Sequence, residues 1–487
     1  MKKELIIEGK YLRSAGRVIR VPFRLRVESN GQISELLCTR VVRVLPGKRL
    51  VCFGEFNGRQ IVAKIFLDPG KAVRHCSREK RGVISLKDAG IKTPELLVSG
   101  TVKPDNIPFL CFQRIIPALD LSEAWQKIRH EDRRVKLLCL ALSAIAAQHE
   151  AGIKQDDLHL DNFLLSGDDI FTIDGNSVDA RRIGKPLGKT KSLENLGLFF
   201  AQLYPKFDYL VPKAFSAYAD KRAWPVTQAL SARLIKKIKT RRNQRKKNIL
   251  KKIYRECTEF ACQKNWDQFL VCERSFHNEP ISRFLADPDT VINSGKLLKD
   301  GNSSTVALVK IGARSLVVKR YNIKNIQHAL KRCLRPSRAW VSWHNAHLLT
   351  ILGIPTPKPI ALLEKRWGPF RFKAYLVSEY VGGIDFYHLL HPDNAKKADR
   401  KILAERFGKL IQSLADASIS HGDFKATNFI VTDDGISIID LDAMCEHRFR
   451  WRFKHMFKKD GNRWMKNWGD LPEIEALFRN QLTQIKL

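Results

Sequence analysis

The chain lacks the features of a secreted or membrane-spanning protein. Its longest largely apolar stretch, Leu137–Ala147, spans eleven of the 487 residues and is too short to cross a bilayer. Charged residues from Lys2 onward interrupt the start of the chain before a signal peptide could form. The ten cysteines form no CxxC pair, and the closest two, Cys257 and Cys262, have no histidine or cysteine partner at metal-ligand spacing. We therefore expect ten buried, reduced thiols in a cytosolic protein.

Acidic residues are scarce relative to basic ones. The 50 Asp and Glu stand against 86 Lys and Arg, a net charge of +36 that predicts a polyanionic partner. Between Arg233 and Arg255 there are twelve lysines and arginines and no acid, and apolar residues recur at helical spacing. This pattern predicts one or two basic amphipathic helices that close the first large lobe. They either present a solvated face or contact an anionic membrane surface, and the lack of a nucleic-acid-binding motif disfavours nucleic acid.

The most specific pattern lies in the second half of the chain. His421, Gly422 and Asp423 open a tight loop, Asn428 follows five residues after the aspartate, and an apolar run leads to Asp440. Phosphoryl transfer of the protein-kinase type needs this arrangement, because one carboxylate accepts the proton of the attacking hydroxyl while an asparagine and a second carboxylate hold Mg²⁺. We predict Asp423 as the catalytic base, Asn428 and Asp440 as Mg²⁺ ligands, and ATP as the donor.

The same spacing occurs in the first half, at Asp157, Asn162 and Asp174. Each of these residues lies 266 positions before its counterpart, which predicts duplication of a whole domain. The length also fits two domains. We predict an α+β fold of two tandem protein-kinase-like bilobal domains, residues 1–262 and 263–487, each with a small antiparallel-sheet lobe and a larger helical lobe. Asp157 is then the base of the first domain, and Asn162 and Asp174 are its Mg²⁺ ligands.

A β-rich segment that precedes the first loop carries a candidate nucleotide-binding lysine. Three short runs separated by turns predict strands: Val41–Leu45, Leu50–Phe53 and Gln60–Phe66. The last contains Lys64 in a VAK triplet, which we expect to contact the nucleotide phosphates. A helix from Arg78 to about Ala89 supplies Glu79 as the predicted partner of Lys64.

The second half repeats the lysine-bearing strand, with Lys319 at the end of Ser315–Lys319. The preceding turn offers three residues that could donate to phosphate: Gly301, Ser303 and Ser304. A helix is predicted from about Arg338 to Leu352, but there is no acid between Lys331 and Ile354. The expected partner of Lys319 is therefore missing, and Asn345 is a weak substitute.

These motifs resemble the bacterial lipopolysaccharide kinase family, kinase-like enzymes that phosphorylate heptose or Kdo in the inner core. In the second half the resemblance rests on HGDFKATNF with IIDLDAM, on GIPTPKP and on the basic RFRWRF…NRWMKNW tail. In the first half it rests on VAK, REK, DDLHLDNFLL and IDG. The resemblance implies a protein-kinase-like fold, ATP with Mg²⁺, and transfer to a sugar hydroxyl at the cytoplasmic face of the inner membrane. The tandem arrangement departs from the single-domain members.

The leading interpretation is an ATP-dependent sugar kinase that acts on an anionic lipopolysaccharide precursor, cytoplasmic and peripheral on the bacterial inner membrane. The catalytic block is shared with aminoglycoside and choline kinases, so a protein or small-molecule kinase is an alternative. The non-enzymatic alternative is a tandem pseudokinase scaffold with one or both halves inactive. The missing acid near Lys319, and Gln155-Asp156 in place of His421-Gly422, favour partial loss. Both copies keep the lysine, the base, the asparagine and the metal-binding aspartate, which favours activity.

Overall fold

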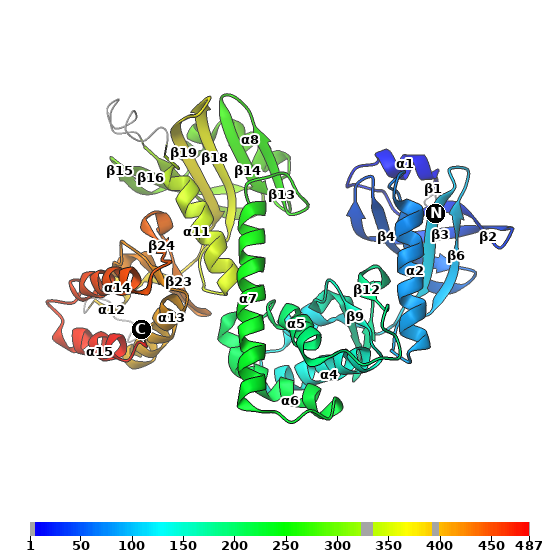
Figure 1. Cartoon of the computed structure of the whole chain (residues 1–487). Coiled ribbons are helices and arrows are strands. Elements are labelled where there is room, and N and C mark those ends of the chain that lie inside the picture. The colour runs from blue at the N-terminus through cyan, green and yellow to red at the C-terminus, as the bar shows by residue number, and fades with distance from the viewer. Residues whose placement is uncertain (1–4, 323–334, 392–398, 487) are drawn as a thin grey trace. The chain divides into compact units, whose positions relative to one another are not determined.

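The structure, a computed structural model, describes residues 5–322, 335–391 and 399–486. The chain forms two compact units (Figure 1). Unit 1 comprises Met1–Leu203 and Phe207–Asn243, and unit 2 comprises Tyr204–Lys206 and Gln244–Leu487. Each unit combines a seven-stranded sheet with a helical region. The mixed helix-and-sheet class is therefore confirmed, whereas the tandem kinase-like lobes and their division at 262/263 stay predictions.

The sheet of unit 1 has the order β1-β2-β3-β4-β5-β7-β6, and a further β2–β6 pairing folds it back on itself. Its strands are β1 (Leu5–Ile6), β2 (Phe23–Ser29), β3 (Gln32–Leu45), β4 (Arg49–Phe56), β5 (Arg59–Phe66), β6 (Leu96–Val102) and β7 (Ile107–Gln113). In β5 the alternating residues Ile61, Ala63 and Ile65 are buried in the sheet core. Because successive strand side chains point to opposite faces, Lys64 faces the other side, where it meets α2 (Ala72–Asp88).

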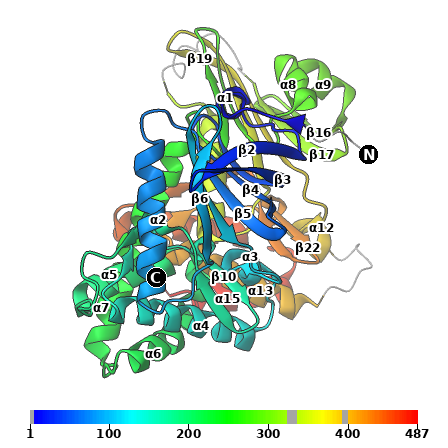
Figure 2. The same cartoon turned by 90° about the vertical axis from the view of Figure 1, so that its right-hand side faces the viewer.

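Helices dominate the rest of unit 1. They are α1 (Gly9–Ser14), α3 (Leu121–Lys127), α4 (Glu131–Glu150), α5 (Lys189–Phe200) and α6 (Val211–Lys221), with the 3₁₀ turns η1 (Leu160–Asn162), η2 (Gly175–Ser177) and η3 (Pro205–Leu210). The short strands are β8 (Leu119–Asp120), β9 (Lys154–Gln155), β10 (Phe163–Ser166), β11 (Asp169–Thr172) and β12 (Val178–Asp179). The β10–β11 hairpin joins Asn162 to Asp174. Figure 2 shows α2 beside the sheet in a second view.

The sheet of unit 2 is antiparallel, in the order β13-β14-β18-β19-β17-β16-β15. Its strands are β13 (Phe260–Lys264), β14 (Gln268–Glu273), β15 (Lys296–Gly301), β16 (Ser304–Ile311), β17 (Arg314–Tyr321), β18 (Pro359–Trp367) and β19 (Phe370–Glu379). The helices α8 (Glu279–Ala286) and α9 (Pro288–Ser294) precede β15. The next described helix, α11 (Arg338–Leu352), has the predicted bounds, set by the Ser337 N-cap and by Gly353 in the left-handed conformation that ends a helix.

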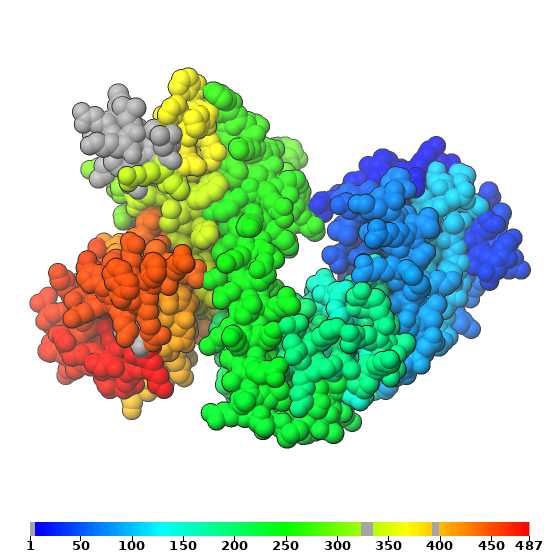
Figure 3. All heavy atoms as spheres, viewed as in Figure 1, coloured from blue at the N-terminus to red at the C-terminus, as the bar shows by residue number. Residues whose placement is uncertain are grey.

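Aromatic side chains pack in the core of the helical region of unit 2. It contains α12 (Phe386–Leu390), α13 (Arg400–Asp416), α14 (Arg450–Met465) and α15 (Pro472–Thr483), the 3₁₀ turns η4 (Ala426–Asn428) and η5 (Leu441–Ala443), and the strands β20 (Ile384–Asp385), β21 (Ile419–Ser420), β22 (Phe429–Thr432), β23 (Gly435–Ile438) and β24 (Cys445–Glu446). Trp464 and Trp468 are fully buried, and Trp464 stacks on Phe407 with ring centroids 4.0 Å apart. The helices α14 and α15 lie side by side on the surface of unit 2 (Figure 3).

The basic junction is one helix, α7 (Gln228–Lys252), drawn in green in Figure 1. Leu234 and Ile238 are buried in the core of unit 1, whereas Leu250 packs against core residues of unit 2. As predicted, α7 packs on the helical region of unit 1, and its residues from Gln244 on belong to unit 2. No helix in the described part of the chain is long and apolar enough to span a membrane.

The cysteines only partly match the prediction of ten buried thiols. Nine lie in the described residues and none of these forms a disulfide. Cys38, Cys52, Cys111 and Cys272 are buried, four others are half-buried, and Cys445 is exposed in the two-residue strand β24. The prediction is wrong for Cys445 because so short an edge strand buries neither of its side chains. Cys333 lies outside the described residues.

Candidate active sites

Unit 1 has a cleft of about 650 Å³ between its sheet and its helical region. Strands β3, β4, β5 and β7 supply apolar walls, including Val51, Val62 and Phe112. Lys64, Glu79 and Asp174 line the same cleft. Three of the residues that the sequence singled out are thus brought together, although Glu79 and Asp174 are 95 positions apart in the chain.

The predicted pair of Lys64 and Glu79 is present. The Lys64 ammonium bonds the Glu79 carboxylate, which is completely buried. Glu79 also accepts hydrogen bonds from the backbone N–H groups of Gly175 at 3.2 Å and Asn176 at 3.1 Å. A buried carboxylate is stable only when it is paired and hydrogen-bonded. Glu79 therefore fixes both the lysine and the loop that follows Asp174.

Glycine at position 175 lets that loop approach helix α2. A Cβ at Gly82 of α2 would lie 2.0 Å from the Gly175 carbonyl oxygen, and a Cβ at Gly175 would lie 2.3 Å from the Glu79 carbonyl oxygen. A side chain at Gly82 or Gly175 would push the helix and the loop apart. Glycine is therefore required at both positions by the close packing of the loop on the helix.

The loop of Asp157 is held by Asn162. The Asn162 side-chain amide donates to the Asp157 backbone carbonyl at 2.6 Å, and the Asn162 carbonyl accepts from Ile173 N–H at 2.8 Å. The Asp157 side chain is 81% exposed, and His159 Nε2 lies 3.6 Å from its carboxylate. The predicted base is therefore open to an incoming molecule.

Asp174 has the properties expected of a cation ligand. It adopts the left-handed backbone conformation, with φ of 70°, and its buried Oδ1 accepts no hydrogen bond within the described residues. Burial by itself would raise the pKa of this carboxyl, but Lys64 and Arg49 outweigh that effect and lower it. An ionised oxygen without a partner suits Mg²⁺, which proteins bind through one or two carboxylates together with substrate phosphates.

Unit 2 has a corresponding cleft of about 370 Å³. Its lining includes Lys319, Asn428 and Asp440, together with Ser304 of the predicted phosphate turn. Gly301 and Ser303 are not part of this lining; their carbonyl groups instead accept hydrogen bonds from Asn322. Ser304 therefore lies at the cleft as predicted, whereas phosphate contacts of Gly301 and Ser303 stay a prediction.

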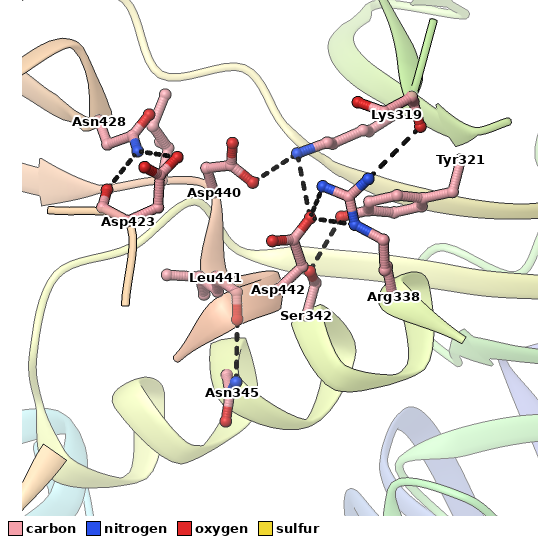
Figure 4. A network of polar contacts seen from close by, with 12 residues as sticks. Lys319, Tyr321, Arg338, Ser342, Asn345, Asp423, Asn428, Asp440, Leu441 and Asp442 are labelled. Carbon is pink, nitrogen blue, oxygen red and sulfur yellow. Dashed lines mark hydrogen bonds and ion pairs between the residues drawn. The ribbon is translucent and has the colours of Figure 1, made fainter. Parts of the chain in front are cut away.

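Lys319 does have acidic partners, which corrects the expectation that it has none (Figure 4). Its ammonium lies 2.5 Å from Asp440 Oδ1 and 3.8 Å from Asp442 Oδ2. Arg338 of α11 contacts the same Asp442 oxygen at 2.6 Å through Nη2 and at 2.9 Å through Nε. Burial would lower the pKa of Lys319, yet Tyr321 and the two aspartates raise it, so the lysine is charged.

Asn345 does not contact the lysine. Its side-chain amide donates to the carbonyl oxygens of Leu441 and Met444, each at 2.9 Å. The prediction of Asn345 as a substitute partner for Lys319 is therefore wrong, because the lysine pairs with Asp440 and Asp442 instead. Asn345 instead ties α11 to the loop that follows Asp440 (Figure 4).

The Asp423 loop of unit 2 is fixed by hydrogen bonds from Asn428 and to Asp460. Asn428 donates to the Asp423 carbonyl at 2.8 Å, as Asn162 does in unit 1. Asp460 accepts from the N–H groups of His421 at 2.7 Å and Gly422 at 3.0 Å. Gly422 has φ of 79°, and a Cβ there would lie 2.5 Å from the Ala443 carbonyl oxygen. The positive φ and the close carbonyl explain why this loop carries glycine at position 422.

Two cations form ion pairs with Asp423, the predicted base of unit 2. Arg463 Nη2 of α14 is 2.6 Å from Asp423 Oδ1, and Lys425 Nζ is 3.3 Å from the same oxygen. The Asp423 side chain is 25% exposed, compared with 81% for Asp157. The two predicted bases therefore have different electrostatic surroundings.

Asp440 matches Asp174 in conformation and charge. Its φ is 60°, and although burial would raise its pKa, Lys319 and Arg338 lower it. In the described parts of the chain, no three His, Cys, Asp or Glu side chains gather as a metal site. An aspartate and an asparagine completed by nucleotide phosphates would hold Mg²⁺ without such a cluster.

Three further residues of this site carry only weak signals in the sequence. Asp442, two positions after Asp440, is a second acid within the IIDLDAM motif. Arg338 is the first residue of a helix that lacks acids, and Arg463 belongs to the basic tail. Neither arginine has a spacing that sets it apart from the many cations of this chain.

A lysine, an aspartate–asparagine loop and a second aspartate around one cleft are typical of kinase-type phosphotransferases. A model of the lipopolysaccharide kinase (Kdo/WaaP) family matches residues 282–463, which lie wholly within unit 2. The matched part of the chain is similar to this family, and the match supports a phosphotransferase.

One curated relative is the 3-deoxy-D-manno-octulosonic acid kinase of Mannheimia succiniciproducens, 26% identical over 157 residues. The alignment covers 31% of this chain and 57% of that kinase, so the chain spans little more than half the length of the relative. Among solved structures, a rhoptry kinase from Toxoplasma gondii has 14% identity and a TM-score of 0.27, with 36% of this chain and 56% of that chain covered. The PknI kinase domain of Mycobacterium tuberculosis has 16% identity and a TM-score of 0.23, with 30% and 60% covered.

Proposed function

We propose that the protein is an ATP-dependent kinase that transfers phosphate to a sugar hydroxyl of the lipopolysaccharide inner core. The observation that carries this proposal is the cleft of unit 2. It brings Lys319, Asn428 and Asp440 together next to the Asp423 loop, within the residues that match the family model. The similarity to a 3-deoxy-D-manno-octulosonic acid kinase supports the same class of acceptor.

Each residue has a distinct proposed role. Asp423 orients the acceptor hydroxyl and accepts its proton. Arg463 and Lys425 both contact Oδ1, so we assign the proton to Oδ2, which accepts only a long hydrogen bond of 3.5 Å from the Asn428 amide. Lys319 binds the nucleotide phosphates, and Asn428 and Asp440 would hold Mg²⁺. When bound, Mg²⁺ neutralises negative charge that develops on the phosphates.

An anionic acceptor fits the surroundings of Asp423. Helix α14 exposes Arg450, Arg452, Lys454, Lys458, Lys459 and Arg463. A carboxylate or phosphate on the sugar would be attracted to this face, and Arg463 is the cation of the set that reaches the base. Basic residues around a site raise the local concentration of an anionic substrate and its rate of association.

We further propose that unit 1 is a second kinase-like domain that arose by duplication and is also active. Its support is the parallel set of Lys64, Asp157, Asn162 and Asp174 at matching spacing, with Glu79 bonded to Lys64. In this proposal Lys64 binds phosphates, Asp157 is the base, and Asn162 and Asp174 would hold Mg²⁺. The functional domains are residues 1–262 and 263–487, and both act at the cytoplasmic surface of the inner membrane.

Titration calorimetry of the full chain with ATP tests the nucleotide half of the proposal. We expect binding in the presence of Mg²⁺ and its loss with a chelator. Asp174→Asn and Asp440→Asn should each remove binding in one unit, whereas Asp434→Asn, on an exposed turn, should change nothing. Absence of Mg²⁺-dependent binding in the wild type would leave the scaffold as the better explanation.

Mass spectrometry of the core oligosaccharide tests the acceptor half. A strain that lacks this protein should lose a phosphate from its inner core, and the wild-type gene should restore it. An unchanged oligosaccharide together with Mg²⁺-dependent ATP binding would favour the protein or small-molecule kinase instead.

A further inference from the structure

In both units a helix is hydrogen-bonded to the loop that follows the second aspartate, close to the nucleotide-binding lysine. The helix side chain that makes these bonds is an acceptor in unit 1 and a donor in unit 2. In unit 1 the acid is on the helix: Glu79 of α2 bonds Lys64 and accepts from two backbone N–H groups of the aspartate loop. In unit 2 the helix α11 carries an amide: Asn345 donates to two backbone carbonyl groups of that loop. The helix is joined to the loop in both, but in unit 2 the helix supplies no negative charge.

The negative charge in unit 2 comes from Asp442 in the loop itself. Its side chain is only 8% exposed and lies between Lys319 at 3.8 Å and Arg338 at 2.6 Å. Removing a carboxylate from water is costly unless cations and hydrogen bonds surround it. Two cations on one nearly buried carboxylate meet that condition.

Arg338 links Asp442 to two other parts of the site. Its Nη1 lies 3.5 Å from the Ser303 carbonyl oxygen on the β15–β16 hairpin. The guanidinium carbon is 5.1 Å from the ring centre of Tyr321, and Lys319 Nζ is 5.0 Å from the same ring. Tyr321 is in turn bonded to Ser342 of α11 at 2.9 Å. The network in Figure 4 therefore ties α11, β17 and the loop together.

Asp440 cannot by itself perform both tasks required of an acid here. It is the nearest carboxylate to Lys319, at 2.5 Å, and it is also the proposed Mg²⁺ ligand. Once a divalent cation binds Asp440, the attraction between that oxygen and the lysine is weakened by the like charge of the ion. A second carboxylate must then keep the ammonium in the cleft.

We propose that Asp442 is the positioning residue for Lys319 in unit 2, in place of the acid that α11 lacks, with Arg338 holding Asp442 in turn. This inference rests on the proposed function, because it concerns the orientation of the nucleotide-binding lysine. Unit 2 is then an active kinase site in which the acid that pairs with the lysine lies in the loop and not on the helix.

The test uses the full chain with Asp174→Asn, a change that we expect to remove nucleotide binding in unit 1. In this reference protein, Asp442→Asn should weaken Mg²⁺-dependent ATP binding by about 10–100-fold, the usual effect of losing a group that orients a ligand in the site. Asp442→Glu keeps the charge and should recover part of the affinity. Asp433→Asn, an exposed aspartate of the same region, is the matched control and should bind as the reference does.

A double-mutant cycle separates positioning from general stability. If Asp442 acts through Lys319, then Asp442→Asn should have little further effect on ATP affinity once Lys319→Ala is present. Additive effects, or equal affinity of Asp442→Asn and the reference, would overturn the inference while leaving the kinase proposal intact. A reference protein that binds no nucleotide would overturn the proposed function of unit 2 and the inference with it.

Discussion

The ammonium of Lys319 lies 2.5 Å from the carboxylate of Asp440, whereas its counterpart Lys64 bonds a buried glutamate on a helix. The proposed metal ligand of unit 2 therefore already has a cationic partner before any ligand binds. In unit 1 the corresponding Asp174 oxygen, Oδ1, is buried without a hydrogen bond within the described residues. Mg²⁺ must therefore compete with a direct ion pair at Asp440, whereas in unit 1 Lys64 lowers the pKa of Asp174 but forms its ion pair with Glu79. We expect unit 1 to bind Mg²⁺·ATP more tightly.

Replacing Glu79 by Gln should destabilise unit 1 and weaken its nucleotide binding. The change removes the charge that holds Lys64 and leaves a buried amide NH₂ facing backbone N–H donors. Breaking one partner of a buried ion pair typically costs about 3–5 kcal/mol. Thermal unfolding and ATP titration of the full chain would measure both effects. Glu95→Gln, which breaks a surface pair with Lys87 at 3.5 Å, is the control and should cost less than about 1 kcal/mol.

Replacing each base should abolish one phosphorylation event and leave the other. General-base catalysis typically supplies about 10²–10⁴-fold in rate, so Asp157→Ala and Asp423→Ala should each lose one product, which mass spectrometry of the phosphorylated acceptor would identify. If Asp423→Ala changes no product while Asp157→Ala removes all of them, unit 2 is a pseudokinase. The reverse result would assign that status to unit 1.

Replacing Arg463 by Ala should raise the KM for the acceptor more than the KM for ATP. Arg463 contacts Asp423 at 2.6 Å from the exposed basic face of α14, so its loss removes a cation beside the acceptor and frees the base. We expect an increase in acceptor KM of about tenfold, the effect of one charge-assisted contact. Arg479→Ala, which breaks an exposed pair with Glu475 on α15, should leave both constants unchanged. Equal rises in both KM values would contradict a role in acceptor binding.

The stability of unit 2 should fall as the pH rises from about 4 to about 6. Burial raises the pKa of Asp460 to about 6, although the N–H groups of His421 and Gly422 donate to it. A carboxyl with a higher pKa in the folded state binds more protons when folded between the two values, so its contribution is present below the unfolded pKa and lost above the folded one. The loss is at most about 3 kcal/mol. Denaturant titrations across this range should show the slope in the wild type and a flatter one in Asp460→Asn.

Binding to anionic vesicles should be peripheral and sensitive to salt. The apolar side chains Leu234 and Ile238 of α7 are buried in unit 1 and are not available to insert into lipid. Exposed lysines remain for a surface contact: Lys236, Lys239, Lys247 and Lys251. Because the screening length falls from about 10 Å at 0.1 M salt to about 3 Å at 1 M, co-sedimentation should decrease steeply over that range. Replacement of the four lysines by glutamine should weaken binding, and salt-insensitive sedimentation would contradict this mode.

The sequence by itself determined the features that depend on local spacing. The bounds of α11 follow from a Ser N-cap and a terminal glycine. The pairing of Lys64 with Glu79 followed from a VAK strand and a helix only 15 residues later. The aspartate–asparagine loops were likewise recognisable because five residues separate each pair, and the same amide-to-carbonyl hydrogen bond closes both.

Only the tertiary structure decided the partners of Lys319. Asp440 is 121 residues away in the chain, and Asp442 reaches the lysine because Asp440 takes a left-handed conformation and η5 then turns the loop back toward the cleft. Periodicity and motif spacing describe only residues that are close in the chain. They therefore showed that α11 has no acid, but they did not show that Asp440 and Asp442 would pair with Lys319. The ion pair depends on where two distant segments meet in space, and that is set by the packing of α11 against η5 and the sheet.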